Sequence, residues 1–206
     1  EAFTEVRYLA HARQMQAMAR IPSLAQEFES VFGRASGGLV RPYRCEDADT
    51  IVIAMGSVIG TLKDTVDALR EQGHRIGVLG IVSFRPFPLV EVAAALSQCK
   101  RFVVLEKSLA VGLGGILATE VRMAVTGMGM TGYTVIAGLG GRAITVQSLT
   151  NMLLKAQRDE LDRVNFLDLD WNAVNQQIEH EKAHRRSGPV AESLLRNAGI
   201  VGARLY

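Results

Sequence analysis

Cysteine is scarce in this 206-residue chain, which has two, Cys45 and Cys99. An iron–sulfur cluster takes about four cysteine ligands, so the chain cannot hold one by itself. The two thiols lie far apart in the sequence and form no CxxC pair, so we interpret them as small buried hydrophobic side chains. Two unpaired thiols are typical of a reducing compartment, which predicts a cytoplasmic protein.

The chain also lacks an excess of charge of one sign, and it lacks long apolar runs. The net charge is only +2, whereas nucleic-acid-binding domains carry clustered positive charge. The basic run at 184–186 is short and is better explained as part of a solvated tail. No run reaches the roughly 18 apolar residues of a membrane span, and the first residues do not follow a signal-peptide pattern. We therefore expect neither nucleic acid nor a membrane as a partner.

The length and composition of the chain fit one domain with additional segments. Hydrophobic residues make up 48% and charged residues 21% of the chain, as in ordinary globular proteins. We expect a helical lead-in over residues 1–48, in which Pro22 ends a first helix and Ser23 caps a second one. An α/β domain follows over 49–156, and a charged, partly helical tail over 157–206. Because the chain begins at Glu1, we expect a piece of a longer polypeptide, although processing or expression would give the same start.

The middle of the chain alternates between β-branched apolar runs and amphipathic segments. Strands are expected at residues 49–55, 76–83, 101–106 and 134–137, and helices at residues 60–72, 89–97, 116–125 and 146–156. The strand run from Thr50 to Met55 is continuously apolar, as in a strand buried on both faces. The alternation predicts a three-layer α/β fold, with a mostly parallel sheet, flanking helices and right-handed crossovers.

Three glycine-rich turns follow the expected strands. Gly56-Ser57 comes where a strand meets a helix, and backbone amides at such a place can hold an anion. The segments 112–115 and 138–141 lack the Lys-Ser/Thr ending of a P-loop and the full GxGxxG pattern. Tight strand-to-helix turns explain all three equally well. Arg142 follows the last turn and could pair with a carboxylate or phosphate, or serve as a surface cap residue.

Two further strings have competing interpretations. The two prolines of Arg85-Pro86-Phe87-Pro88 stiffen the chain, so they predict a fixed cation and a fixed aromatic ring at an interface. A rigid loop that covers the core is the alternative. The string His180-Glu181-Lys182-Ala183-His184 matches the letters of the HExxH zinc motif. It lies in a polar tail with no later histidine, so a solvated helix explains it better.

The order of these motifs resembles a known family. A strand ends in MGS, a second leads to RPFP, a third ends in VVLEKS before GLGG, and a fourth runs into GLGGR and a Thr-capped helix. Over residues 24–155 this order is similar to the C-terminal, transketolase-C-like domain of the alpha subunit of pyruvate:ferredoxin and related 2-oxoacid:ferredoxin oxidoreductases. The chain departs from the family pattern at Glu106-Lys107, where an Asp is common, and at Ala143, which follows GLGGR.

The resemblance implies a division of labour within a larger enzyme. The family decarboxylates a 2-oxoacid such as pyruvate on thiamine diphosphate, passes electrons through iron–sulfur clusters to ferredoxin, and gives the acyl group to coenzyme A. Thiamine diphosphate, Mg²⁺ and the clusters are expected in partner domains or subunits. This chain then binds no cofactor or metal alone, has no catalytic residue, and serves interdomain contacts and homo- or hetero-oligomer assembly.

We select eight residues as candidates for ligand-edge or interface contacts: Gly56, Ser57, Arg85, Phe87, Gly114, Gly115, Gly140 and Arg142. Three alternatives stay open. The chain could be a free-standing Rossmann-like module with a nucleotide at one of the later glycine turns. It could be the equivalent domain of a transketolase or of a 2-oxoacid dehydrogenase beta chain. It could also be a purely structural assembly domain of an unrelated parent.

Overall fold

The structure, a computed structural model, describes residues 2–184. Its strands are β1 (Val40–Tyr43), β2 (Thr50–Ala54), β3 (Ile76–Ile81), β4 (Arg101–Glu106), β5 (Thr131–Ile136) and β6 (Val164–Phe166). Its α-helices are α1 (Phe3–Phe32), α2 (Val58–Glu71), α3 (Leu89–Leu96), α4 (Ile116–Ala124), α5 (Val146–Gln157) and α6 (Trp171–His184), and a 3₁₀ turn, η1, covers Leu139–Gly141. The described helices include no candidate for a membrane-spanning segment.

The six strands form one sheet in the order β1-β3-β2-β4-β5-β6. β1 runs antiparallel to β3, and all other neighbouring pairs are parallel. All residues of β2 and β3 are buried, which explains their continuous apolar sequences. The predicted α/β class with a mostly parallel sheet is confirmed.

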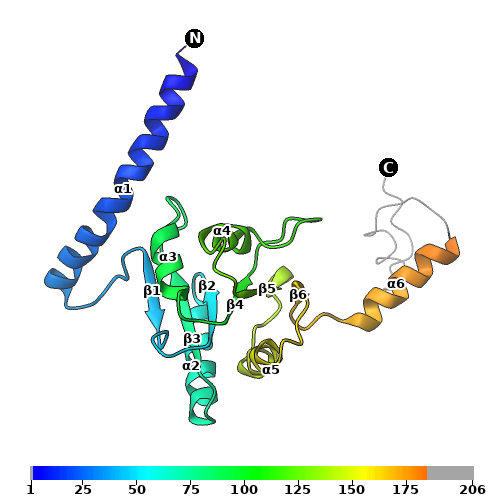
Figure 1. Ribbon diagram of the computed structural model, residues 1–206. Coiled ribbons are helices and arrows are strands. Elements are labelled where there is room, and N and C mark those ends of the chain that lie inside the picture. The colour runs from blue at the N-terminus through cyan, green and yellow to red at the C-terminus, as the bar shows by residue number, and fades with distance from the viewer. Residues whose placement is uncertain (1, 185–206) are drawn as a thin grey trace. The chain divides into compact units, whose positions relative to one another are not determined.

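The helices α2, α3, α4 and α5 cover the two faces of this sheet (Figure 1). α2 and α5 pack together on one face, and α3 and α4 on the other. On α2 the stripe Leu62, Val66 and Leu69 is fully buried. Burial of one such side chain contributes about 1.5–3 kcal/mol, so the two apolar layers stabilise the domain. The Thr145 cap of α5 is confirmed, because its Oγ1 accepts a hydrogen bond from the Ser148 amide at 3.1 Å.

One crossover departs from the prediction. We expected every crossover between parallel strands to be right-handed. The connections through α2, α3 and α4 all have the same hand. The step from β5 to β6 crosses the sheet in the same direction as the step from β4 to β5, but its helix α5 lies on the opposite face. This crossover therefore has the opposite hand. The reason is coverage, because α5 fills the face of β4 and β5 that α2 leaves open.

The segments outside 49–156 also differ from expectation. α1 is a single helix that runs through Pro22, so the predicted break there is wrong, and none of its described residues is buried. The sheet extends past both predicted boundaries, because β1 lies before residue 49 and β6 lies beyond residue 156. The chain divides into two compact units, with the boundary in the sequence between Leu167 and Asp168. The predicted division at 48 and 156 stays a prediction.

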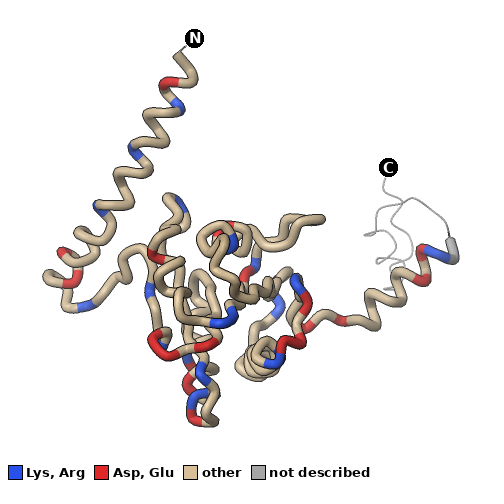
Figure 2. The backbone as a smooth tube through the Cα atoms, viewed as in Figure 1, with Lys and Arg blue, Asp and Glu red and all other residues tan. Residues whose placement is uncertain are grey.

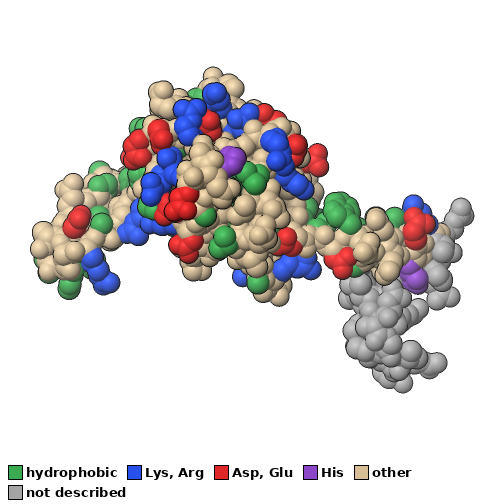
Figure 3. Space-filling view, turned by 90° about the horizontal axis from the view of Figure 1, so that it is seen from below, with side chains coloured by type: hydrophobic (Ala, Val, Ile, Leu, Met, Phe, Trp, Pro, Cys, Tyr) green, Lys and Arg blue, Asp and Glu red, His purple; other side chains and the backbone are tan. Residues whose placement is uncertain are grey.

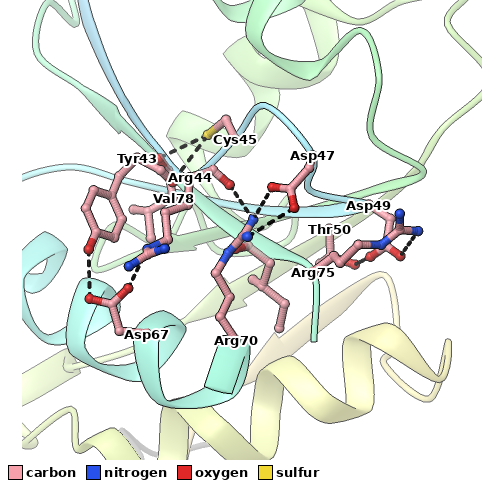
Figure 4. A network of polar contacts seen from close by, with 11 residues as sticks. Tyr43, Arg44, Cys45, Asp47, Asp49, Thr50, Asp67, Arg70, Arg75 and Val78 are labelled. Atoms are coloured by element: carbon pink, nitrogen blue, oxygen red, sulfur yellow. Dashed lines mark hydrogen bonds and ion pairs between the residues drawn. The ribbon is translucent and has the colours of Figure 1, made fainter. Parts of the chain in front are cut away.

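A polar network ties the β1–β2 connection to the C-terminal half of α2 (Figure 4). The Arg70 guanidinium donates to the Arg44 carbonyl and to Asp47 Oδ1, both at 2.7 Å. The hydrogen bond from Arg70 holds the pKa of Asp47 below its ordinary value. Asp67 accepts a hydrogen bond from Tyr43 Oη at 2.7 Å and forms an ion pair with Arg44 Nε at 2.6 Å. The network is structural and lies at the end of α2 away from the strands' carboxyl edge.

Candidate functional site

A cleft of about 420 Å³ opens at the carboxyl ends of β2, β4 and β5. It is lined by Met55, Ser57, Val58, Thr61, Glu106, Lys107, Gly138, Arg142 and Ile144. β2 and β4 are neighbours in the sheet although β3 lies between them in sequence. The chain leaves β2 toward β3 on one side and leaves β4 toward β5 on the other. In open α/β sheets, ligands gather at this kind of reversal.

Glu106 ends β4 and binds the start of α4 rather than the open cleft. Its Oε2 accepts a hydrogen bond from the Leu117 amide at 2.8 Å, and its Oε1 accepts one from the Ala118 amide at 2.9 Å. A carboxylate is favoured there, because the first backbone amides of a helix lack partners and carry partial positive charge. The glutamate that departs from the family pattern therefore caps a helix.

Gly115 makes this contact possible. A Cβ at position 115 would overlap Glu106 Oε1 and would lie 2.9 Å from Thr134 Cγ2. Its backbone is extended, with φ −79° and ψ 146°, so an L-residue could adopt it. The glycine is thus required for the close approach of the carboxylate and not for its backbone conformation.

The remaining polar groups of the cleft are hydroxyls and cations. Ser57 directly precedes α2, and Thr61 lies in its first turn. No described side chain caps this helix. Lys107 follows β4, and Arg142 follows the η1 turn. The positive end of the α2 dipole adds to these two cations. The cleft is therefore suited to an anionic group.

Charge elsewhere on the molecule is mixed. Acidic and basic residues both occur throughout the tube of Figure 2, and their side chains are interspersed on the face that Figure 3 shows. No extended single-sign patch appears on that face. This agrees with the small net charge of +2.

Of the eight candidate residues, the structure places Ser57 and Arg142 in the cleft wall. Gly56 precedes Ser57 with φ 77°, and Gly140 lies within η1 with φ 63°, so both adopt backbone that favours glycine. Gly114 belongs to the loop before α4, where its φ is 119°. The ligand or interface roles of these residues stay predictions.

Arg85 and Phe87 lie apart from the cleft lining. Arg85 Nη2 donates to Glu120 of α4 at 2.6 Å, and its guanidinium stacks on Phe84 at 4.2 Å from the ring centroid. Phe87 is 8% exposed and belongs to the core beneath α3 and α4. The expected presentation of its ring at the surface is therefore wrong. The alternative interpretation, a rigid loop that covers the core, describes its position.

Sequence reasoning missed Thr61, Glu106, Lys107 and Ile144 as parts of the site. Lys107 directly follows a predicted strand, so its position at the carboxyl edge was a usable signal. Thr61 offered a weaker signal, one helical turn after Ser57. The convergence of all four depends on β2 lying beside β4, which the order of elements in the sequence does not state.

Metal-binding groups are absent from the part of the chain that the structure describes, where no three His, Cys, Asp or Glu side chains are placed to hold an ion. His180 and Glu181 lie on α6, and the side chain of His184 lies outside the described residues. Cys45 and Cys99 are free and buried, as predicted. Burial raises the pKa of Cys45, and it raises the pKa of Cys99 to about 11. Such thiols do not fit a cluster.

Comparison with known proteins places this domain. A model of the pyruvate:ferredoxin oxidoreductase core domain II matches residues 48–149, which run from the start of β2 into α5. The chain belongs to this family. Core domain II thus coincides with the part of the sheet that builds the cleft.

Two relatives illustrate the likeness. The pyruvate synthase subunit PorA of Methanosarcina barkeri is 38% identical over 163 residues, which cover 77% of this chain and 40% of that protein. The ketoisovalerate oxidoreductase subunit VorA of Pyrococcus horikoshii is 36% identical over 149 residues, which cover 71% of this chain and 38% of that protein. The chain thus spans about 40% of the length of these relatives.

Among solved structures, the 2-oxoglutarate:ferredoxin oxidoreductase of Magnetococcus marinus is similar, with a TM-score of 0.44 and 20% identity. The likeness covers 64% of this chain and 21% of that one.

Core domain II offers no set of His, Cys, Asp and Glu ligands for the metals of the family. The described part offers no cluster of metal ligands. Glu106, the one carboxylate among the described residues that line the cleft, has each of its oxygens bonded to an amide of α4. Neither an iron–sulfur cluster nor a thiamine-bound Mg²⁺ therefore has ligands here, and we derive no chemical step on such a group.

Proposed function

We propose that this chain is part of the alpha subunit of a 2-oxoacid:ferredoxin oxidoreductase, with pyruvate as the first substrate to test. The whole enzyme would oxidatively decarboxylate the 2-oxoacid to an acyl-CoA and reduce ferredoxin. Core domain II would contribute assembly contacts and no catalytic residue, so the isolated chain would be inactive. The observation that carries this proposal is the match of residues 48–149 to core domain II.

The relatives support a role as one part of an assembly. Both are described as subunits, one of a pyruvate synthase and one of a ketoisovalerate oxidoreductase. The absence of metal-ligand clusters from the described residues is consistent with cofactors held by other parts of the enzyme. In this proposal thiamine diphosphate, Mg²⁺ and the iron–sulfur clusters belong to partner domains or subunits.

An exposed apolar loop is the best candidate for the assembly contact. The loop between β4 and α4 closes on itself, because Ala110 and Gly114 exchange two backbone hydrogen bonds of 2.7 and 2.8 Å. At its tip Val111 is 93% exposed and Leu113 is 71% exposed. Large apolar side chains held outward on a closed loop favour contact with another protein surface. We assign this loop to the interface with the thiamine-binding part of the enzyme.

The test uses the complete enzyme with Leu113→Asp in this chain. A charge at the tip would be buried in the assembled enzyme, so we expect the partner chains to be lost on size-exclusion chromatography and the activity to fall with them. The matched control is Met123→Asp on α4, where the side chain is 54% exposed. We expect that variant to keep its partners. An L113D enzyme that assembles and works like the wild type would overturn the interface assignment.

A further inference from the structure

We propose that the cleft between the carboxyl ends of β2, β4 and β5 binds the phosphate group of a small molecule. The proposed function does not require such a site, because it gives core domain II assembly contacts alone. The site is built entirely by residues of the first compact unit. Its volume of about 420 Å³ lies within the range of small-ligand pockets.

The charges that face the cleft favour an anion. Lys107 and Arg142 both line it, and Glu106 is the only acid among the described residues of its wall. The carboxylate of Glu106 is engaged by the α4 amides at 2.8 and 2.9 Å. The negative charge in the wall is therefore balanced by the positive end of α4, and Lys107 and Arg142 line the same cleft as the start of α2.

Gly138 forms the part of the wall beside one of these cations. Gly138 has φ 73°, and a Cβ on it would lie 3.4 Å from Lys107 Cε and 3.2 Å from Ile144 Cδ1. A Cβ at this position would be tight against Ile144 and in ordinary van der Waals contact with the lysine stem. Glycine at 138 is favoured by its left-handed backbone, and Lys107 and Ile144 pack beside it.

The donors come from three different elements, which distinguishes phosphate from a carboxylate. Ser57 and Thr61 offer hydroxyls from the α2 side, Lys107 lies at the end of β4, and Arg142 follows β5 and η1. A tetrahedral phosphate presents oxygens in several directions, whereas a carboxylate presents two oxygens in one plane. A guanidinium and an ammonium are the usual side-chain partners of phosphate. Met55, Val58 and Ile144 add an apolar wall for an organic portion.

The test is calorimetric titration of the 206-residue chain with inorganic pyrophosphate at low ionic strength. We expect the wild type to bind and Lys107→Met to weaken the affinity about tenfold, because a hydrogen bond to a charged group is lost. Lys100→Met is the matched control, since Lys100 and Lys107 flank opposite ends of β4 and both are exposed. We expect that variant to bind within about twofold of the wild type, because an exposed charge at that distance is screened.

Two results would overturn the proposal: no binding by the wild type, or equal weakening in K107M and K100M, which would indicate attraction to overall charge. A parallel titration compares inorganic phosphate with adenosine monophosphate. Tighter binding of the nucleotide would assign the site to a phosphate ester, and equal binding would assign it to free phosphate. Because the readout is binding to the isolated chain, its failure leaves the proposed function of the whole enzyme unaffected.

Discussion

Replacement of Gly115 by alanine tests the most specific contact in the structure. The added Cβ would overlap Glu106 Oε1 and crowd Thr134 Cγ2, so the carboxylate would have to leave the α4 amides. Loss of a helix cap costs about 0.5–2 kcal/mol, and forcing extra atoms into a packed site costs about 1–3 kcal/mol. We therefore expect the free energy of unfolding of Gly115→Ala to fall by about 3 kcal/mol. Urea unfolding of the 206-residue chain measures it.

Gly140→Ala is the control for a general effect of losing glycine. Its φ is 63°, and nothing lies within 4 Å of the position that a Cβ would take. The substitution should cost only the strain of a left-handed backbone, about 1 kcal/mol. An equal loss in both variants would show that the approach of Glu106 is not the cause.

A double-mutant cycle separates the overlap from other effects. Glu106→Ala removes the carboxylate and should cost about 1–2 kcal/mol on its own. In that background Gly115→Ala has no carboxylate to displace, so its cost should shrink by at least about 1 kcal/mol. If the cost of G115A is the same with and without Glu106, the reasoning is refuted.

Two further variants test contacts away from the cleft. Hydrogen bonds from Arg101, the larger effect, and from Tyr133 lower the pKa of Asp159 to about 2. The stabilising contribution of the Asp159 carboxylate is therefore complete above the unfolded pKa of about 3.9 and is lost as the pH falls toward 2. Asp159→Asn should make stability less pH-dependent over that window, and a carboxyl NMR titration that gives an ordinary pKa would contradict this. Arg70→Lys should lower the free energy of unfolding by about 1–3 kcal/mol, since lysine cannot keep the forked contacts of the guanidinium. The control Arg75→Lys, at one exposed ion pair, should change it by under about 1 kcal/mol. Similar losses in the two variants would count against the network.

The central elements could be predicted from the sequence because their signals are local. β4 was predicted at Arg101–Glu106 and is found there, and the start of α5 follows its Thr145 cap. Continuous apolar runs, bounded by glycine turns, mark strands that are buried on both faces.

The peripheral elements carry weaker signals. β1 contains Pro42, and a proline in the sequence argues against a strand. The structure tolerates it because β1 lies at the edge of the sheet. β6 has only three residues, and its pairing with β5 depends on α5 crossing to the face of α2. Pro22 favoured a helix break, yet α1 continues through it.

The candidate site was predictable only in part. Ser57 and Arg142 could be found because each follows a strand and a glycine turn. The cap between Glu106 and α4 could not, because the partners are eleven and twelve residues apart and meet only after β4 and α4 have packed. The exposed apolar tip of the loop at Val111 was likewise hidden, since burial depends on the tertiary fold.

The proposal that this chain is part of a 2-oxoacid:ferredoxin oxidoreductase is best tested on the native protein purified from its source. Reduction of a viologen dye is followed with pyruvate and other 2-oxoacids, with and without coenzyme A, and every copurifying chain is identified by mass spectrometry. We predict activity that requires both a 2-oxoacid and coenzyme A, together with partner segments that carry the thiamine site and cluster cysteines. A chain that purifies without such segments and shows no 2-oxoacid-dependent reduction would contradict it.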